Sequence, residues 1–169
     1  MQTISLCMIV KNEENTLTTC LGSVKDIVDE IIIVDTGSDD NTKQEALKFT
    51  NKIYDFQWVD DFSLARNYSY SKATKDYILW MDADDLILPE DRLKLISLKE
   101  SLSSDVDAVM MKYNTGFDSQ SKVLFSYYRE RLTKRSRNFK WHEPVHEYLE
   151  IKGNIINSDI CITHTKKSS

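Results

Sequence analysis

The sequence predicts an α/β fold, with a mostly parallel β-sheet flanked by helices and a small mixed or antiparallel extension in its C-terminal part. Three observations carry this prediction. Short apolar runs alternate with helical periodicity through the first hundred residues, several of these runs stop at polar clusters, and after Ser104 strand-like segments follow one another without a helix. With 169 residues, 41% of them hydrophobic, the chain is long enough for one domain with its own core.

The first hundred residues alternate strand and helix. Residues 4–10 form a short apolar run and predict a buried strand, and residues 13–24 place Leu17, Leu21 and Val24 on one helix face. Pro89 suits the first turn of a later helix. The remaining elements of this part are strands at 30–34, 52–56 and 77–81 and helices at 41–49, 63–73 and 89–102. Such alternation predicts a parallel sheet covered on both faces.

The second part of the chain reads as strands. The strand-like segments are 106–113, 123–132, 139–141 and 160–164, with a turn at 134–138. We expect them to extend the same sheet, so that residues 1–165 form one domain. Residues 166–169 are expected to be a loose tail, at which the chain could be truncated before a further domain.

The charge distribution argues against nucleic acid as a partner. The net charge is −5, and residues 1–100 carry 19 acidic and 11 basic side chains, whereas phosphate backbones require a basic footprint. The basic residues of the second part admit two interpretations, a solvated hairpin or a patch facing an anionic acceptor, a donor phosphate or a membrane surface. They are Arg129, Arg131, Lys134, Arg135, Arg137 and Lys140.

Apolar runs and cysteines bear on the cellular location. No apolar run reaches the roughly 18 residues that cross a bilayer. Residues 1–10 lack the basic region of a secretory signal, so we expect no transmembrane segment and a cytoplasmic protein. Cys7, Cys20 and Cys161 are too widely spaced for a zinc site and are interpreted as small buried hydrophobes.

Carboxylates follow two of the predicted strands. Asp82 and Asp84 are two residues apart, which on an extended strand directs both side chains to one centre, and carboxylate oxygens suit Mg²⁺ or Mn²⁺. The alternative is a turn in which Asp84 or Asp85 caps the next helix. Asp35, at the tip of another strand, can accept hydrogen bonds from a base or ribose or cap the helix that follows.

Five motifs together resemble a known family. The first three are Met-Ile-Val-Lys-Asn-Glu-Glu at residues 8–14, Ile-Ile-Ile-Val-Asp-Thr-Gly-Ser-Asp-Asp-Asn-Thr at 31–42 and Met-Asp-Ala-Asp-Asp at 81–85. They resemble family 2 glycosyltransferases of the GT-A fold. Asp-Phe-Ser-Leu-Ala-Arg-Asn at 61–67 and Trp-His-Glu-Pro-Val-His-Glu at 141–147 are similar to a bacterial subgroup, which includes peptide S-glycosyltransferases and enzymes with a tetratricopeptide-repeat tail. The resemblance covers residues 3 to about 165.

This resemblance implies a donor, a cation and a set of binding residues. The donor would be a nucleotide-diphosphate sugar, with UDP as the carrier, and the cofactor Mn²⁺ or Mg²⁺. The acceptor would be a glycan, a lipid-linked glycan or a peptide. The implied nucleotide-sugar contacts are Val10, Glu13, Asp35, Arg66, Asp82 and Ala83, and the implied metal ligands are Asp84 and His164.

The resemblance also implies an inverting transfer that needs a base and no covalent intermediate. Glu147 is the first candidate, and His146 is its rival because an imidazole suits base chemistry at neutral pH. The family usually places an acidic pair at the matching position. Residues 145–147 (Val-His-Glu) lack that pair, which leaves both candidates open.

Two other functions are compatible with these residues. The fold could bind a nucleotide sugar as a non-catalytic module or scaffold. A nucleotidyltransferase is less favoured, because the chain has only four glycines and none lies in a basic, glycine-rich loop after the first strand. The same scarcity excludes a P-loop and a dinucleotide-binding fingerprint.

Overall fold

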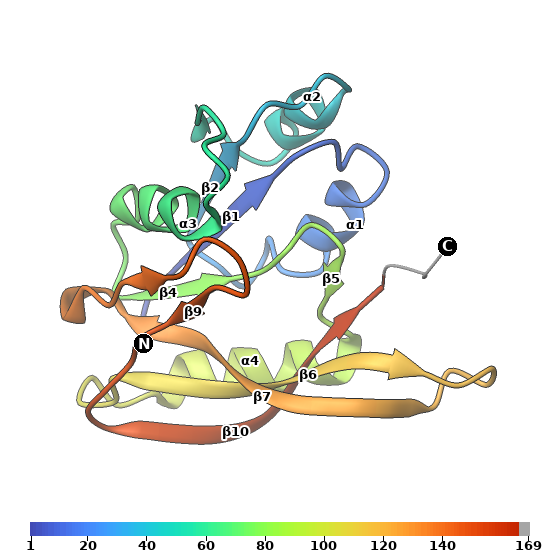
Figure 1. Cartoon of the computed structure of the whole chain (residues 1–169). Coiled ribbons are helices and arrows are strands. Elements are labelled where there is room, and N and C mark those ends of the chain that lie inside the picture. Colours follow the sequence, from blue (N-terminus) through green and yellow to red (C-terminus); the bar gives the residue numbers. More distant parts are fainter. Residues whose placement is uncertain (166–169) are drawn as a thin grey trace.

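The computed structural model describes residues 1–165 and consists of one large sheet with helices on both faces (Figure 1). The predicted tail, 166–169, lies outside the described residues. The sheet has the strand order β3-β2-β1-β4-β7-β6-β10-β5, and β8 pairs with β9 separately. The strands are β1 (Ile4–Val10), β2 (Glu30–Asp35), β3 (Ile53–Asp55), β4 (Tyr77–Trp80), β5 (Asp85–Leu86), β6 (Ala108–Phe117), β7 (Val123–Lys134), β8 (Trp141–His142), β9 (Tyr148–Leu149) and β10 (Ile155–His164). The helices are α1 (Leu17–Gly22), α2 (Thr42–Leu47), α3 (Phe62–Ser71) and α4 (Pro89–Ser101), with a short 3₁₀ turn at Arg135–Arg137.

The first half of the sheet is parallel, as predicted. β1 lies between β2 and β4 and runs parallel to both, and β3 continues the parallel order beyond β2. Because successive side chains of a strand point to opposite faces, β1 contributes to two cores. Leu6 and Met8 pack into the larger core with residues of α1, α2 and α4, whereas Cys7 packs into a smaller core beside α3. Helices therefore cover both faces, which confirms the prediction of a buried parallel sheet.

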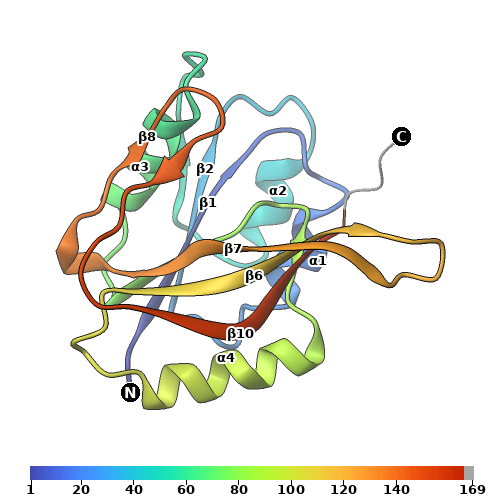
Figure 2. The same ribbon diagram turned by 60° about the horizontal axis from the view of Figure 1, so that its bottom comes forward.

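The second half is mixed. β7 runs antiparallel to both β4 and β6, while β10 is parallel to β6 and antiparallel to the short β5. Figure 2 shows α4 lying along the face of β6 and β10 and the β6–β7 hairpin projecting beyond the rest of the molecule. The expected mixed extension of one sheet is confirmed.

Several element bounds differ from the prediction. The helix expected at 13–24 is only α1, because residues 14–16 before it and residues 23–27 after it form turns. The last strand, expected at 160–164, begins at Ile155, since residues 155–157 already pair with β6. A register shift accommodates the turn-forming Ser158 and Asp159 before pairing resumes at Cys161. The strand expected at 139–141 is replaced by β8, and β5 and β9 were not predicted because two residues carry no period.

Burial tests the interpretation of the three cysteines as small buried hydrophobes. Cys7 and Cys20 are buried, as predicted, but Cys161 is partly exposed, because β10 carries it on a strand with alternating exposure. No helix within the described 165 residues is both long enough and apolar enough to cross a bilayer.

Candidate functional site

The carboxyl ends of β1, β2 and β4 meet at one edge of the sheet, because the three strands are parallel. A cleft of about 540 Å³ lies at this edge. Ligands of open parallel sheets bind at this position. The cleft is lined by Ile9, Val10, Lys11, Glu13, Thr36, Trp58, Phe62, Arg66, Asp82, Ala83, Asp84 and Glu147. Seven of the ten candidate site residues predicted from the sequence line the cleft, and the three that do not are Asp35, His146 and His164.

Asp35 is buried directly behind the cleft, where its neighbour Thr36 lines the wall. Its Oδ2 accepts hydrogen bonds from the amides of Gly37 (3.1 Å) and Ser38 (2.9 Å). Asp35 thus holds the turn after β2, and the following helix α2 begins after Asn41. Its Oδ1 is buried and has no hydrogen-bond partner among the described residues, so this oxygen is a spare acceptor beside the cleft.

Arg66 joins two carboxylates across the cleft. Helix α3 is capped by Asp61, whose carboxylate accepts from the Leu64 amide (3.1 Å), and it carries Arg66 on its buried face. The Arg66 Nη2 donates to Asp82 Oδ1 (2.9 Å), and its Nε lies 3.7 Å from Glu147 Oε2. Burial alone would lower the pKa of Arg66, but the charges of Asp82 and Glu147 outweigh it and raise that pKa. The guanidinium is therefore a permanent cation at the site.

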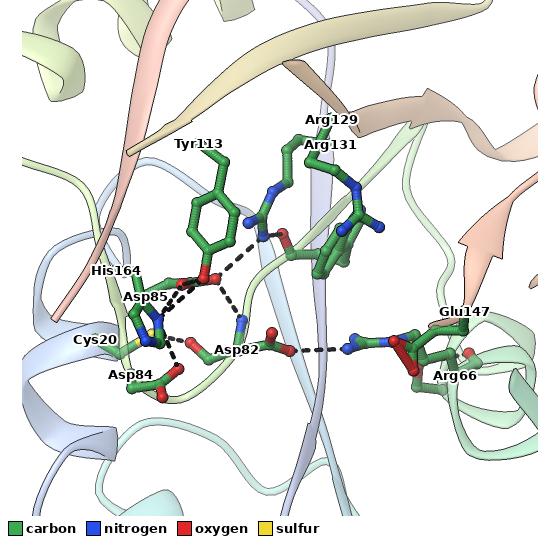
Figure 3. Close-up of polar contacts among 12 residues, drawn as sticks. Cys20, Arg66, Asp82, Asp84, Asp85, Tyr113, Arg129, Arg131, Glu147 and His164 are labelled. Atoms are coloured by element: carbon green, nitrogen blue, oxygen red, sulfur yellow. Dashed lines mark hydrogen bonds and ion pairs between the residues drawn. The ribbon is translucent and has the colours of Figure 1, made fainter. Parts of the chain in front are cut away.

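The turn after β4 corrects one prediction. β4 ends at Trp80, and the Asp85 amide donates to the Asp82 carbonyl (2.9 Å), so residues 82–85 form a turn instead of an extended strand. Asp82 and Asp84 therefore do not face one centre: Asp82 points to Arg66 and Asp84 points to His164 (Figure 3). Burial opposes ionisation of Asp82, but Arg66 and Arg131 hold the pKa of its carboxyl below the usual range.

Asp84, Asp85 and His164 form the candidate metal centre. One ligand atom from each lies within 4.8 Å of the others, and His164 Nδ1 is 3.7 Å from Asp84 Oδ1 and 3.9 Å from Asp85 Oδ1. The antiparallel pairing of β10 with β5 places His164 opposite Asp85. Two carboxylates with one imidazole are a donor set that fits Mn²⁺ or Mg²⁺. The two ligands inferred from the sequence thus come together, with Asp85 added.

Asp85 was missed as a site residue, and the interpretation of Asp84 or Asp85 as a helix cap is wrong. Helix α4 begins after Leu88 with no side-chain cap. Asp85 is buried and accepts hydrogen bonds from the Tyr113 hydroxyl (2.6 Å) and Arg131 Nη1 (3.1 Å). Burial raises the pKa of the Asp85 carboxyl despite the opposing charge of Arg131. Arg131 lies at the buried C-terminal end of β7, where neighbouring charged residues in the sequence conceal its role in this network.

The basic residues do not form one surface. Arg131 is fully buried, so the interpretation as a solvated hairpin is wrong for this residue. Arg137 pairs with Asp107 (3.3 Å), and Lys134 donates to the Ser104 carbonyl. Arg129 pairs with Glu130 (3.1 Å). The basic segment is thus divided between the interior and separate local partners.

The motifs at 61–67 and 141–147 bind each other. The Asn67 side chain donates to the Trp141 carbonyl (3.1 Å) and accepts from the Trp141 amide (2.8 Å). The Ser63 hydroxyl donates to the Glu143 carbonyl (2.6 Å). This docking brings Glu147 to the cleft wall, whereas His146 is exposed and does not line the cleft. The role of Asn67 was not predicted from the sequence, because it is a contact between segments 74 residues apart.

Residues 5–150 match the family model described as Glycosyl transferase family 2. The chain belongs to this family. A TPR repeat-containing protein of Synechococcus elongatus is 35% identical over 150 residues, which cover 89% of this chain and 36% of that protein. Glycosyltransferase SunS of Bacillus phage SPbeta is 34% identical over 149 residues, covering 86% of this chain and 34% of SunS. The chain thus spans about a third of the length of these relatives.

Solved structures share the fold of this family 2 glycosyltransferase. S. aureus TarS aligns over 97% of this chain and 37% of its own, with a TM-score of 0.67 and 16% identity. Glucosyl-3-phosphoglycerate synthase from Mycobacterium tuberculosis, solved with Mn²⁺ and UDP-glucose, aligns over 66% of this chain and 44% of its own, with a TM-score of 0.54 and 22% identity. These likenesses and the α/β architecture confirm the predicted GT-A fold.

Proposed function

We propose that this glycosyltransferase domain moves a sugar from a nucleotide-diphosphate sugar, with UDP as the carrier, to an acceptor nucleophile in a metal-dependent, inverting reaction. The observation that carries the proposal is the cleft at the carboxyl edge of the sheet, which is lined by residues of the acidic turn (82–85) together with Arg66 and Glu147. The family membership supports the transfer chemistry. TarS, solved with UDP, and the synthase, solved with Mn²⁺ and UDP-glucose, support the donor and the cation as analogies.

In this proposal three groups of residues bind the nucleoside, the diphosphate and the cation. Val10, Glu13 and the spare oxygen of Asp35 contact the nucleoside. Asp82 and Ala83 lie beside the ribose and diphosphate, with Arg66 behind Asp82. Asp84 and His164, assisted by Asp85, would hold Mn²⁺ or Mg²⁺, and the cation would neutralise charge on the diphosphate.

The transfer itself requires little more than orientation and one proton acceptor. The acceptor's oxygen or sulfur forms a bond to the anomeric carbon as the bond from that carbon to the diphosphate oxygen breaks, and the diphosphate leaves with the electron pair. Glu147 takes the acceptor's proton. We favour Glu147 over His146 because its carboxylate lies on the cleft wall, whereas His146 is exposed outside it.

Calorimetry with UDP tests the donor and the cation together. The wild-type protein should bind UDP more tightly with Mn²⁺ than without it. Asp84→Ala should remove this dependence, while Glu100→Ala, which changes an exposed carboxylate on α4, should leave it unchanged. Equal Mn²⁺-dependent binding by Asp84→Ala and wild type would contradict the metal role of Asp84.

One observation favours a second candidate function, a nucleotide-sugar-binding module without catalysis. Glu147 Oε2 lies 3.7 Å from Arg66 Nε, so the candidate base is already engaged in an ion pair, as a carboxylate with a purely structural role would be. The two functions differ in turnover. A catalytic domain should hydrolyse a UDP-sugar slowly in the absence of acceptor and lose this hydrolysis in Glu147→Gln, whereas a binding module would bind UDP and show no hydrolysis above the protein-free rate.

A further inference from the structure

Beside the cleft, two guanidinium groups pack against three aromatic rings. The Arg66 guanidinium carbon lies 4.8 Å from the Trp141 ring centroid and 4.7 Å from that of Trp80. The Arg131 guanidinium carbon lies 3.8 Å from the Trp80 ring and 4.4 Å from the Tyr113 ring. We call this the guanidinium–aromatic stack, and its members are Trp141, Arg66, Trp80, Arg131 and Tyr113. The Trp80 and Trp141 rings also meet edge to face, with centroids 5.1 Å apart, and the Arg129 guanidinium carbon lies 5.0 Å from the Trp80 ring.

Each guanidinium of the stack holds one carboxylate of the acidic turn. Arg66 binds Asp82 (2.9 Å), and Arg131 binds Asp85 (3.1 Å). The outer members reach further: Tyr113 Oη is 3.1 Å from His164 Nδ1, and Arg66 Nε is 3.7 Å from Glu147 Oε2. The stack therefore runs from the candidate base to the candidate metal centre.

The Trp80 ring contacts both Arg66 and Arg131. It is 2% exposed at the end of β4, and its indole N–H donates to the Glu130 carbonyl (2.7 Å), which fixes the plane of the ring. The same ring faces both guanidiniums, and it is followed after one residue by the acidic turn. A displacement of this ring would therefore release Asp82 and Asp85 together.

We propose that Trp80 is a positioning residue, which fixes Asp82 and Asp85 relative to each other by holding Arg66 and Arg131 in the guanidinium–aromatic stack. Arg131 is fully buried, and its Nε and Nη2 have no hydrogen-bond partner among the described residues. The Asp85 carboxylate and the Trp80 carbonyl (3.2 Å) compensate this charge at Nη1, and the ring faces of Trp80 and Tyr113 add to them where Nε and Nη2 have no partner. An aliphatic side chain could fill the volume of Trp80, but it offers no negative ring face to either guanidinium.

Hydrogen exchange of the free protein tests this role without any ligand. Trp80→Leu should raise exchange of the amides at 82–85 by at least tenfold, and Trp80→Phe should restore most of the protection. Ile78→Ala is the matched control, because Ile78 is a buried residue of β4 in the core beside α3 and is not part of the stack. Wild-type protection at 82–85 in Trp80→Leu, or an equal loss in Ile78→Ala, would overturn the proposal.

A second measurement covers the case in which Trp80→Leu does not fold. Replacing tryptophan by its mono-, di- and trifluoro analogues weakens the negative face of the ring while keeping its shape nearly constant. Exchange at 82–85 should rise with each added fluorine, and this trend should be largely reduced in the Trp80→Phe protein. Exchange that does not depend on fluorination would contradict the stack.

The functional consequence rests on the proposed function and is measured separately. The affinity for UDP with Mn²⁺ should fall at least tenfold in Trp80→Leu and recover in Trp80→Phe. If wild type does not bind UDP with Mn²⁺, the proposed function fails, and exchange at 82–85 still decides the role of Trp80. If wild type binds and Trp80→Leu binds equally well, the positioning role fails alone.

Discussion

Glu147 and His146 are neighbours in the chain, but their surroundings differ. Glu147 lines the cleft beside the buried Arg66, whereas His146 has a left-handed backbone (φ 55°) and an exposed side chain. The sequence left both residues open as the base, because adjacent residues cannot be distinguished without the path of the loop. The contact of Asn67 with Trp141 supplies that path.

The base assignment predicts a separation of turnover from donor binding. Glu147→Gln removes the proton acceptor but keeps the shape, so UDP-sugar turnover should fall by about 10²–10⁴-fold. The affinity for UDP should stay within about twofold. His146→Gln is the matched control and should turn over at nearly the wild-type rate. Full activity in Glu147→Gln, or a comparable loss in His146→Gln, would reject Glu147 as the base.

The roles of the residues in the acidic turn could be predicted from the sequence only in part. The carboxylates at 82–85 suggested a cation site beside the alternative of a helix cap, and the resemblance to family 2 glycosyltransferases implied His164 as an added ligand. The different partners of Asp82 and Asp85 could not be predicted, because they are Arg66 from α3 and Arg131 from β7, which are distant in the sequence. Asp85 was missed for the same reason.

Helix α3 and the segment from β8 to β9 behave as one structural unit. Asn67 pairs with both backbone groups of Trp141, and the Phe62 amide donates to the Pro144 carbonyl (2.9 Å). The cluster of Trp80, Phe139, Trp141 and Leu149 packs beneath these contacts. The two sequence motifs were recognised separately, but only the structure places them against each other.

Removing the Asn67 side chain should loosen this unit. Asn67→Ala leaves the buried Trp141 amide and carbonyl without partners, which should cost about 2–4 kcal/mol of unfolding free energy. Ser71→Ala removes an exposed hydroxyl from the same helix and should change stability by less than about 0.5 kcal/mol. Urea unfolding measures both. A loss below about 1 kcal/mol in Asn67→Ala would show that α3 docks by other contacts.

The extent of prediction differs between the two halves of the sheet. β1, β2 and β4 were located within one residue at each end, because buried parallel strands appear in the sequence as continuous apolar runs. The start of β10 was not, because residues 155–159 are largely exposed and are held by long-range contacts, namely pairing with β6 and the ion pair of Asp159 with Lys94 (3.4 Å). Local signals thus recovered the parallel half of the sheet, whereas long-range pairing decided the mixed half.

For the whole molecule, Glu30 connects the start of the parallel strands. Its side chain is 1% exposed and accepts hydrogen bonds from Ser5 Oγ (2.7 Å), from the Thr74 amide (2.9 Å) and from Lys52. Burial favours the neutral form, but the hydrogen bonds from Lys52, Ser5 and Thr74 outweigh it and lower the pKa of Glu30 to about 2. The ionised carboxylate is therefore part of the folded state.

This carboxylate predicts acid sensitivity. Because the pKa is lower in the folded than in the unfolded chain, where it is 4.5, the stabilisation is complete above pH 4.5 and is lost as the pH falls towards 2. The loss attributable to Glu30 should reach about 3 kcal/mol. Urea unfolding at pH 7 and pH 3 should therefore show a smaller decline for Glu30→Gln than for wild type, and identical declines would contradict the role of Glu30.

The carboxyl edge of the sheet is proposed to bind a nucleotide diphosphate through a cation, and a crystal structure with UDP and Mn²⁺ is the sharpest test. We expect the anomalous signal of manganese between Asp84 and His164, with uridine against Val10, Glu13 and Asp35. Manganese or uridine bound away from this cleft, or a cleft that stays empty at saturating UDP and Mn²⁺, would contradict it.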